Sequence, residues 1–279
     1  MMHIKKTISL LLSLQSLLCG NSAAMDHTYS SIQKLKEIGA WYDPEPEGRA
    51  PLDENIVMSS PFWHKIKQNM TESGAFSEQD ENEIENVCRS LRNSDHTRHV
   101  RRFNIAAALY LGINTECQWM QEALSVFVLY DDCPLVALML KKGCNPNAVY
   151  VGEYIIFRAK TVAMAELLRN NGANFNVTTC DRTLLHDIFV HDKDSALIPY
   201  YIQYGVDPMQ QDGDGQTALE EGIMYHGFCG DKQQNIIDRV AGFMEAGVSE
   251  DDILAVGQKN KIYQPYVVKA IGLYYKNKK

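Results

Sequence analysis

Cysteine is too scarce in this chain to stabilise its fold. The 279 residues contain seven cysteines, spread singly, with no C-x-x-C pair and no histidine at a zinc-ligand spacing from them. A small disulfide-stabilised scaffold needs a much denser set, so that class of protein is excluded. We interpret most of these thiols as small buried hydrophobic side chains, and isolated disulfide pairs stay open.

Positive charge is also in deficit. Lys and Arg number 27 against 35 Asp and Glu, which gives a formal net charge of −8. This balance disfavours binding to nucleic acid or to an anionic membrane by bulk charge. The two glycine-rich phosphate-binding patterns, G-x-x-x-x-G-K-[ST] and G-x-G-x-x-G, do not occur. We therefore expect no nucleotide and no other cofactor.

Long hydrophobic runs are absent beyond the first two dozen residues. There, Lys5 and Lys6 precede an apolar run over 8–19, and small side chains follow at 22–24. This order is typical of a secretory signal peptide spanning 1–24, with cleavage predicted near Ala24. An uncleaved N-terminal anchor is the alternative. After cleavage we expect an exported chain, periplasmic or secreted, with no membrane span.

Residues 25–77 are predicted to be a linker with short helical pieces. The stretch 43–51 holds three prolines and several charges, which favour an extended conformation. Ser60 followed by Pro61 is typical of a helix N-terminus. The apolar side chains of that helix are Phe62, Trp63 and Ile66. A separate hypothesis gives this region the role of a docking arm that orders on binding.

Helical periodicity becomes regular from Ser77 onward. Ser77 with Asp80 three residues later indicates a helix start, because acidic groups complement the N-terminal dipole. The apolar stripe of this helix is Ile84, Val87, Cys88 and Leu91. A following helix over about 97–111 presents Val100, Phe103, Ala107 and Tyr110.

The decisive feature is a recurring helix end. Five apolar helical segments each stop at a glycine that is followed by a small or apolar residue, with spacings of 31, 29, 33 and 42 residues. A period near 33 indicates a solenoid of helix pairs. A glycine ends a helix within one residue because it adopts a left-handed conformation without Cβ strain. The glycines are Gly112, Gly143, Gly172, Gly205 and Gly247.

The segments between these glycines resemble the ankyrin repeat. Residues 172–186 read GANFNVTTCDRTLLH, and residues 205–220 read GVDPMQQDGDGQTALE, close to the G-A-D-x-N turn and D-x-x-G-x-T-P-L-H helix start of that family. The resemblance covers about 120–250 well and 78–279 loosely. It implies an all-α solenoid of stacked helix–turn–helix repeats with short hairpin loops, over 78–250. Residues 251–279 would be a C-terminal helical cap.

Several departures from the repeat pattern are visible. Leu184, Ala218 and Ala123 stand where the family has proline. Pro199 lies in a second helix, which it should start or kink. The unit over 149–171 is about four residues short, and the unit over 224–247 is stretched by about nine residues in the turn between its helices. The predicted cap would direct inward the side chains of Ile253, Leu254, Val267, Val268, Ile271 and Leu273.

The resemblance implies a protein partner, bound by the hairpin tips and the concave face of the first helices. The predicted tips are 148–153, 178–182 and 210–216, where exposed aromatic and arginine side chains would contribute most. The candidate partner-binding residues are Tyr150, Glu153, Thr179, Asp181, Arg182, Gln211, Asp212 and Asp214. We expect a non-catalytic scaffold, either a secreted effector or an adaptor.

Two short patterns in the sequence resemble metal sites. His186 and Asp187, with Asp238 downstream, could mimic the metal set of an HD-type hydrolase. However, His186 stands where the ankyrin pattern places a histidine that holds the hairpin by hydrogen bonds, and we favour that structural role. Residues 212–215 resemble the start of a calcium loop, but the required later glycine and glutamate are missing, so we predict a turn and no metal site.

Overall fold

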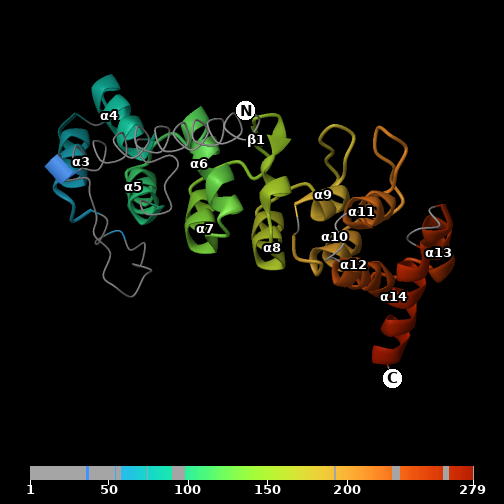
Figure 1. The fold of residues 1–279 in the computed structure, drawn as a ribbon. Helices are drawn as coiled ribbons and strands as arrows, with labels where there is room; N and C mark the ends of the chain where they lie inside the picture. Colours follow the sequence, from blue (N-terminus) through green and yellow to red (C-terminus); the bar gives the residue numbers. More distant parts are fainter. Residues whose placement is uncertain are drawn as a thin grey trace, which may run out of the picture. The chain divides into compact units, whose positions relative to one another are not determined.

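The computed structural model describes residues 36–37, 54, 58–73, 75–89, 98–191, 193–227, 233–259 and 264–278. The predicted leader (1–24), the proline-rich stretch (43–51) and Leu91 lie outside these residues. The chain divides into two units, Met1–Asn114 and Thr115–Lys279. Both are built mainly from helices (Figure 1).

The first unit packs helices α3 (Pro61–Ser73), α4 (Glu78–Arg89) and α5 (Arg98–Tyr110). The Ser60 carbonyl accepts the N–H of His64 at 2.9 Å, so the predicted Ser-Pro start of α3 is correct. Trp63 is fully buried, and its Nε1 donates to Asn104 Oδ1 on α5 at 2.7 Å. Helix α3, which the Ser60–Pro61 pair predicts, is therefore packed against α5 within this unit.

Helix α4 begins with a reciprocal cap. The hydroxyl and the backbone N–H of Ser77 donate to Asp80 Oδ2 at 2.6 and 3.1 Å, and the Asp80 N–H donates to Ser77 Oγ at 3.1 Å. These bonds lower the pKa of the buried Asp80 carboxyl, and the bond from the Ser77 hydroxyl has the largest effect. The stripe behind this cap is buried at Ile84, Val87 and Cys88, as the periodicity predicts.

Two rows of elements make up the second unit (Figure 1). The first row contains α6 (Gln118–Leu129), the 3-10 helix η2 (Ile155–Arg158), α9 (Leu184–Val190), α11 (Ala218–Gly227) and α13 (Glu250–Lys259). The second row contains α7 (Cys133–Lys141), α8 (Val162–Asn170), α10 (Leu197–Gln203), α12 (Gln233–Glu245) and α14 (Gln264–Asn277). Each element contacts the next element of its own row, so the core runs between the rows. Among its fully buried side chains are Phe127, Leu135, Ile155, Leu168, Leu185, Val240 and Ile253.

All five predicted glycines end helices with left-handed backbones. Their φ angles lie between 82° at Gly112 and 101° at Gly143. At each turn the glycine N–H bonds three residues back and the following N–H bonds five residues back, as in Gly143 to Leu140 and Cys144 to Met139, both at 3.0 Å. This is the Schellman motif, which satisfies carbonyl groups that the ending helix leaves free.

The short unit differs from the all-α expectation. Strands β1 (Val149–Tyr150) and β2 (Glu153–Tyr154) form a two-stranded antiparallel hairpin, and the single turn of η2 replaces a first helix. The deficit of about four residues that the sequence shows is thus the loss of one helical turn. Ile155, Ile156 and Phe157 of η2 are still buried, so the row stays filled.

Pro199 is the third residue of α10, where it starts the helix without interrupting it. The enlarged turn of the stretched unit falls between α11 and α12, and residues 228–232 lie outside the described part of the chain. The cysteines that the structure describes are free thiols. Cys88 and Cys144 are buried, and burial raises the pKa of the Cys144 thiol to about 12.

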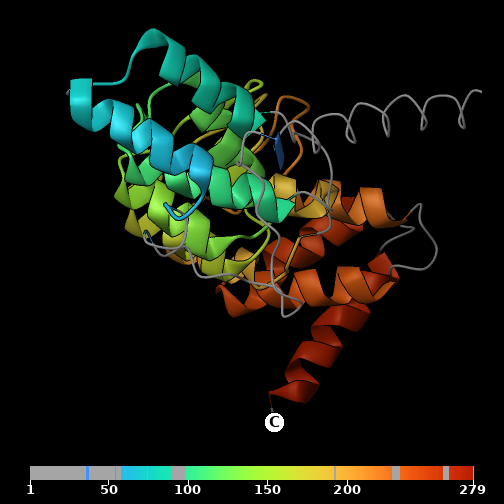
Figure 2. The ribbon, with the colours of Figure 1, turned by 90° about the vertical axis from the view of Figure 1, so that its left-hand side faces the viewer.

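The C-terminal pair α13 and α14 covers the end of both rows. Ile253, Val267 and Ile271 are buried as predicted, but Val268 is 51% exposed. The inward placement of Val268 is wrong because consecutive helical residues point about 100° apart, and Val267 takes the inner face. Figure 2 shows the end of α14, in red, projecting beyond the rest of its unit.

Candidate functional site: three hairpin tips

Tip 1, residues 148–153, is the most apolar of the three predicted tips. Val151 and Gly152 form its two-residue turn with φ angles of 55° and 79°, the primed geometry that suits a tight hairpin. Val151 is 80% exposed and Val149 is 47% exposed. The predicted residues Tyr150 and Glu153 are instead half-buried against Arg158, whose guanidinium lies 5.7 Å from the Tyr150 ring and 3.3 Å from the Glu153 carboxylate.

Tip 2, residues 178–182, is closed by two backbone hydrogen bonds between Thr179 and Arg182, each 3.0 Å long. Cys180 and Asp181 occupy the turn with φ angles of 50° and 61°. Both turn residues are exposed. Arg182 does not point into solvent, because its Nη2 pairs with Glu221 Oε2 on α11 at 2.5 Å.

Tip 3, residues 210–216, is shaped by one aspartate. Asp212 Oδ1 accepts the N–H groups of Asp214 and Gln216 at 3.0 and 2.9 Å. The predicted residues Gln211 and Asp214 are exposed. A Cβ atom at Gly213 would lie 3.3 Å from Asp181 Oδ2, so tips 2 and 3 touch each other.

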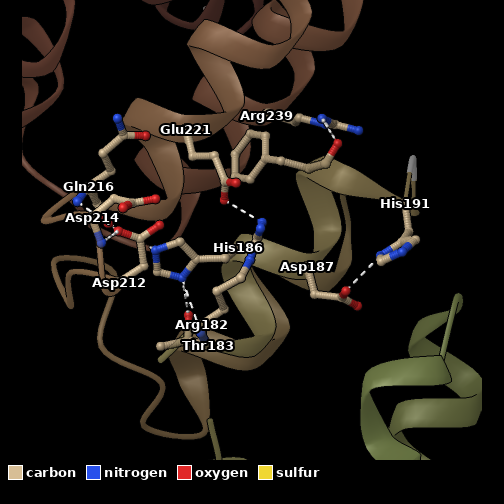
Figure 3. A network of polar contacts seen from close by, with 11 residues as sticks. Arg182, Thr183, His186, Asp187, His191, Asp212, Asp214, Gln216, Glu221 and Arg239 are labelled. Carbon is tan, nitrogen blue, oxygen red and sulfur yellow. Dashed lines mark hydrogen bonds and ion pairs between the residues drawn. The ribbon is translucent and has the colours of Figure 1, made fainter. Parts of the chain in front are cut away.

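His186 joins tips 2 and 3 at their base (Figure 3). The N–H and hydroxyl of Thr183 lie 3.2 and 2.8 Å from Nδ1, which acts as the acceptor. The other ring nitrogen, Nε2, therefore carries the proton and donates to the Gln216 carbonyl at 3.1 Å. The geometry agrees with the predicted structural role. In the next unit, Glu220 takes the same position and accepts the Thr217 N–H at 2.7 Å.

The metal set predicted for a hydrolase does not assemble. Asp187 faces the opposite side of α9 from the His186 ring (Figure 3) and bonds His191 Nδ1 at 2.7 Å. Asp238 is exposed on α12 and accepts from Gln234. In the described residues His186 is instead grouped with Asp212 and Glu221, with one possible ligand atom from each lying within 4.8 Å of the others.

Opposing effects act on the pKa of the Glu221 carboxyl, and burial has the largest effect. Burial raises the pKa of the Glu221 carboxyl, and the negative charge of Asp212 raises it further. The Arg182 guanidinium acts in the opposite direction but does not cancel the effect of burial. The base of tips 2 and 3 thus holds two carboxylates, one imidazole and the Arg182 guanidinium, which pairs with Glu221.

A buried ion pair was not predicted from the sequence. Lys193 Nζ is buried between the Asp187 carboxylate and the Phe157 carbonyl of η2. Burial lowers the pKa of this amine despite the nearby carboxylate. The sequence places Lys193 in a charged turn after α9, a pattern that favours a solvated side chain. The only sequence signal for its burial is the length of that turn.

One asparagine side chain joins two of the turns that follow second-row helices. Asn147 Nδ2 donates to the Gly172 carbonyl at 2.8 Å, and its Oδ1 accepts the Asn174 N–H at 2.7 Å. One side chain therefore fixes the turn that follows α7 to the turn that follows α8. At the corresponding place after Gly205 stands Met209, which is 43% exposed.

Comparisons with known proteins give one structural likeness. No family model matches the chain, and no curated protein matches it. The crystal structure of the ankyrin repeat domain of Bcl-3, described as a unique member of the IkappaB protein family, is similar with 18% identity and a TM-score of 0.34. The match covers 62% of this chain and 93% of that chain.

Helices of the described residues are all too short or too polar to span a bilayer. Sequence reasoning missed Val149 and Val151 of tip 1, and Met209, which directly precedes tip 3. Their only signal in the sequence is a large apolar side chain inside a segment rich in turn-forming residues. It also missed Glu221, since Arg182 and Glu221 are 39 positions apart.

Proposed function

We propose that the chain is an ankyrin-type repeat protein that binds another protein without catalysis. The two rows of elements, the Schellman turns and the Thr183–His186 cap support this proposal. In such a solenoid the tips form one continuous edge, beside the concave face of the first row. Binding would result from shape complementarity over several units.

The observation that carries the proposal is the exposure of Val149, Val151 and Met209 at turns with ordered backbones. Exposed apolar side chains in otherwise polar loops are typical of interaction surfaces. Because hydrogen bonds of the turns fix the backbone at each tip, little conformational entropy would be lost on binding. Asp181, Gln211 and Asp214 would supply the polar rim of this surface.

The test is capture of a partner by the purified mature protein. We expect Val151→Asp to abolish capture, since it places a charge in the centre of tip 1. The variant should fold normally, because Asp tolerates the left-handed backbone better than a β-branched residue does. Tyr150→Ala and Arg182→Ala should weaken capture to a lesser degree, because both side chains are already partly packed.

The matched control is Val268→Asp, which changes another exposed valine, 51% exposed against 80% for Val151, on α14 and away from the tips. Capture that survives Val151→Asp, or that fails only in the Val268→Asp variant, would move the binding surface off the tips and overturn the proposal.

We also propose that the protein is exported and acts as a secreted effector or adaptor. The charged, apolar and small-residue segments of 1–24 support this. Expression of the full chain in a host with a secretory pathway should yield a mature protein that begins after Ala24. An intact N-terminus on the exported or membrane fraction would contradict cleavage.

A further inference from the structure

The three hairpin tips carry a surplus of negative charge. Together they contain four acidic residues against one basic residue, Arg182. Arg182 is already paired with Glu221 on α11, which neutralises its charge. Asp181 and Asp214 are exposed, so their carboxylates face solvent beside the exposed valines of tip 1. A surface that fits this edge must therefore combine apolar side chains with positive charge.

Helix α14 carries that combination. Residues 264–279 contain four lysines and no acidic residue, although the whole chain has a net charge of −8. Val268 is 51% exposed and Tyr275 is 48% exposed, and residues seven positions apart lie on one side of a helix. Lys269 and Lys276 are exposed directly beside them. These four residues form what we call the outer face of α14.

The outer face of α14 is turned away from the helices that support it. Helix α14 packs mainly against α12 and α13, which bury Val267 and Ile271 on its inner side. A Cβ atom at Gly272, on the outer face, would meet nothing within 4 Å. Figure 2 shows the end of this helix projecting beyond the rest of the unit. The outer face is therefore accessible to another molecule.

The tips and the outer face of one chain cannot reach each other. Figure 1 shows the tips on one side of the second unit and the end of α14 on the opposite side. Pairing tips with tips would bring carboxylates together, and pairing two copies of α14 would bring lysines together. Contact between the tips of one copy and α14 of another is the arrangement in which the charges attract.

We propose that the hairpin tips of one copy of this chain bind the outer face of α14 of a second copy, head to tail. The valines of tip 1 pack on Val268 and Tyr275, while the aspartates of tips 2 and 3 face the two lysines. Each contact leaves a free tip edge on one copy and a free α14 on the other, so association continues as the concentration rises. Exposed ion pairs contribute little each and are screened by salt, so the association is weak and salt-sensitive.

A second copy on the tips would compete with the partner of the proposed function, and this consequence alone rests on that function. Self-association is measured on the purified chain by itself. It can therefore fail while partner capture succeeds, and the reverse. The Val268→Asp variant should capture a partner at least as well as the parent chain, because its tips are free more of the time.

The experiment is sedimentation velocity of the untagged full chain over a concentration series. We expect the weight-average mass to rise with concentration up to about 1 mM, and to rise less at high salt. A tip variant, Asp181→Asn with Asp214→Asn, should weaken association by about tenfold. A helix variant, Lys269→Gln with Lys276→Gln, should do the same. All four side chains are exposed, so thermal melts should be unchanged.

Mixing the two variants separates head-to-tail contact from a symmetric one. The tip variant keeps an intact α14, and the helix variant keeps intact tips. An equimolar mixture should therefore regain the parent affinity for one contact and stop at the dimer, because both remaining ends are altered. A symmetric dimer could not be restored by mixing, since each of its contacts uses the same surface on both copies.

The matched controls remove the same charges elsewhere: Glu78→Gln with Glu81→Gln on α4, and Lys141→Gln with Lys142→Gln at the end of α7, all exposed. Neither control should change the association. The proposal is overturned if the parent chain stays monomeric throughout the series, if the controls weaken association as much as the tip and helix variants do, or if mixing those two variants restores nothing.

Discussion

Gly222 shows how a single residue controls the contact between two helices. A Cβ atom at this position of α11 would lie 1.9 Å from the Phe189 ring of α9, far inside van der Waals contact. Phe189 is buried and stacks on Phe243 with ring centroids 6.1 Å apart, so it has little room to move. We predict that Gly222→Ala destabilises the second unit by about 3 kcal/mol, at the upper end of overpacking effects.

Chemical denaturation followed by circular dichroism measures this change. The matched control is Gly272→Ala in α14, where a Cβ atom would meet nothing within 4 Å. That substitution should be neutral or stabilising by up to about 1 kcal/mol, since alanine favours helices over glycine. Equal effects at the two positions would show that α9 and α11 do not approach as closely as described.

Sequence reasoning succeeded at single residues where the requirement is local. The five turn glycines and Thr183 with His186 act within a few positions of each other, so their roles follow from short patterns. Exposure of Val151 depends on a turn type that a β-branched residue seldom adopts, and no pattern predicts it. The partner of Arg182 depends on how two units pack, which is a tertiary fact.

At the scale of the element, the cap of α4 predicts that the stability of the first unit depends on pH. The folded-state pKa of Asp80 is lowered below its ordinary value of 3.8, chiefly by the Ser77 hydroxyl. The charged carboxylate therefore adds stability above pH 3.8, and this contribution is lost as the pH falls through the lowered pKa. Asp80→Asn should lose this acid dependence and cost about 1 kcal/mol at neutral pH.

Urea denaturation monitored by Trp63 fluorescence, in a background without the other tryptophans, measures this stability. Glu81→Gln is the control, because this exposed acid of the same turn does not bond Ser77 through its side chain. If Asp80→Asn kept the acid dependence of the parent protein, another carboxyl would be responsible for it.

The Lys193–Asp187 pair predicts strong energetic coupling between the turn after α9, which holds Lys193, and α9 itself, which holds Asp187. Lys193→Met or Asp187→Leu alone leaves a buried charge without its partner and should cost about 3–5 kcal/mol. The double variant should cost clearly less than the sum, because both charges leave the interior together. A double-mutant cycle in urea measures the coupling, and additive costs would show that the pair does not interact.

Whole elements were predicted well where each had its own periodicity and end signals. Helices α3 and α4 begin directly after the predicted capping residues Ser60 and Ser77, and α5 begins one residue after the predicted start at 97. The hairpin β1–β2 with η2 was not predicted, because the shortened unit leaves too few residues to show a helical or an alternating period. Burial by the neighbouring elements decides the structure there.

At the scale of the molecule, the two rows of the second unit predict how the loss of stability from a core substitution is distributed over the helices. Ile253 is fully buried in α13, which packs mainly against α11 and α14. Ile253→Ala should cost about 2–5 kcal/mol by leaving a cavity. Because each unit of a repeat array is stabilised mainly by its neighbours, the loss should be greatest at α13 and α14, smaller at α11 and absent at α6.

Hydrogen exchange with mass spectrometry measures this gradient, since protection factors report local opening free energies element by element. The control is Leu135→Ala in α7, also fully buried, which should give the reverse gradient and leave α13 protected. If either variant lowered protection equally across residues 118–277, the second unit would be one cooperative globule. The proposed binding surface is built from repeat units that stack one on the next. A single cooperative globule would therefore contradict it.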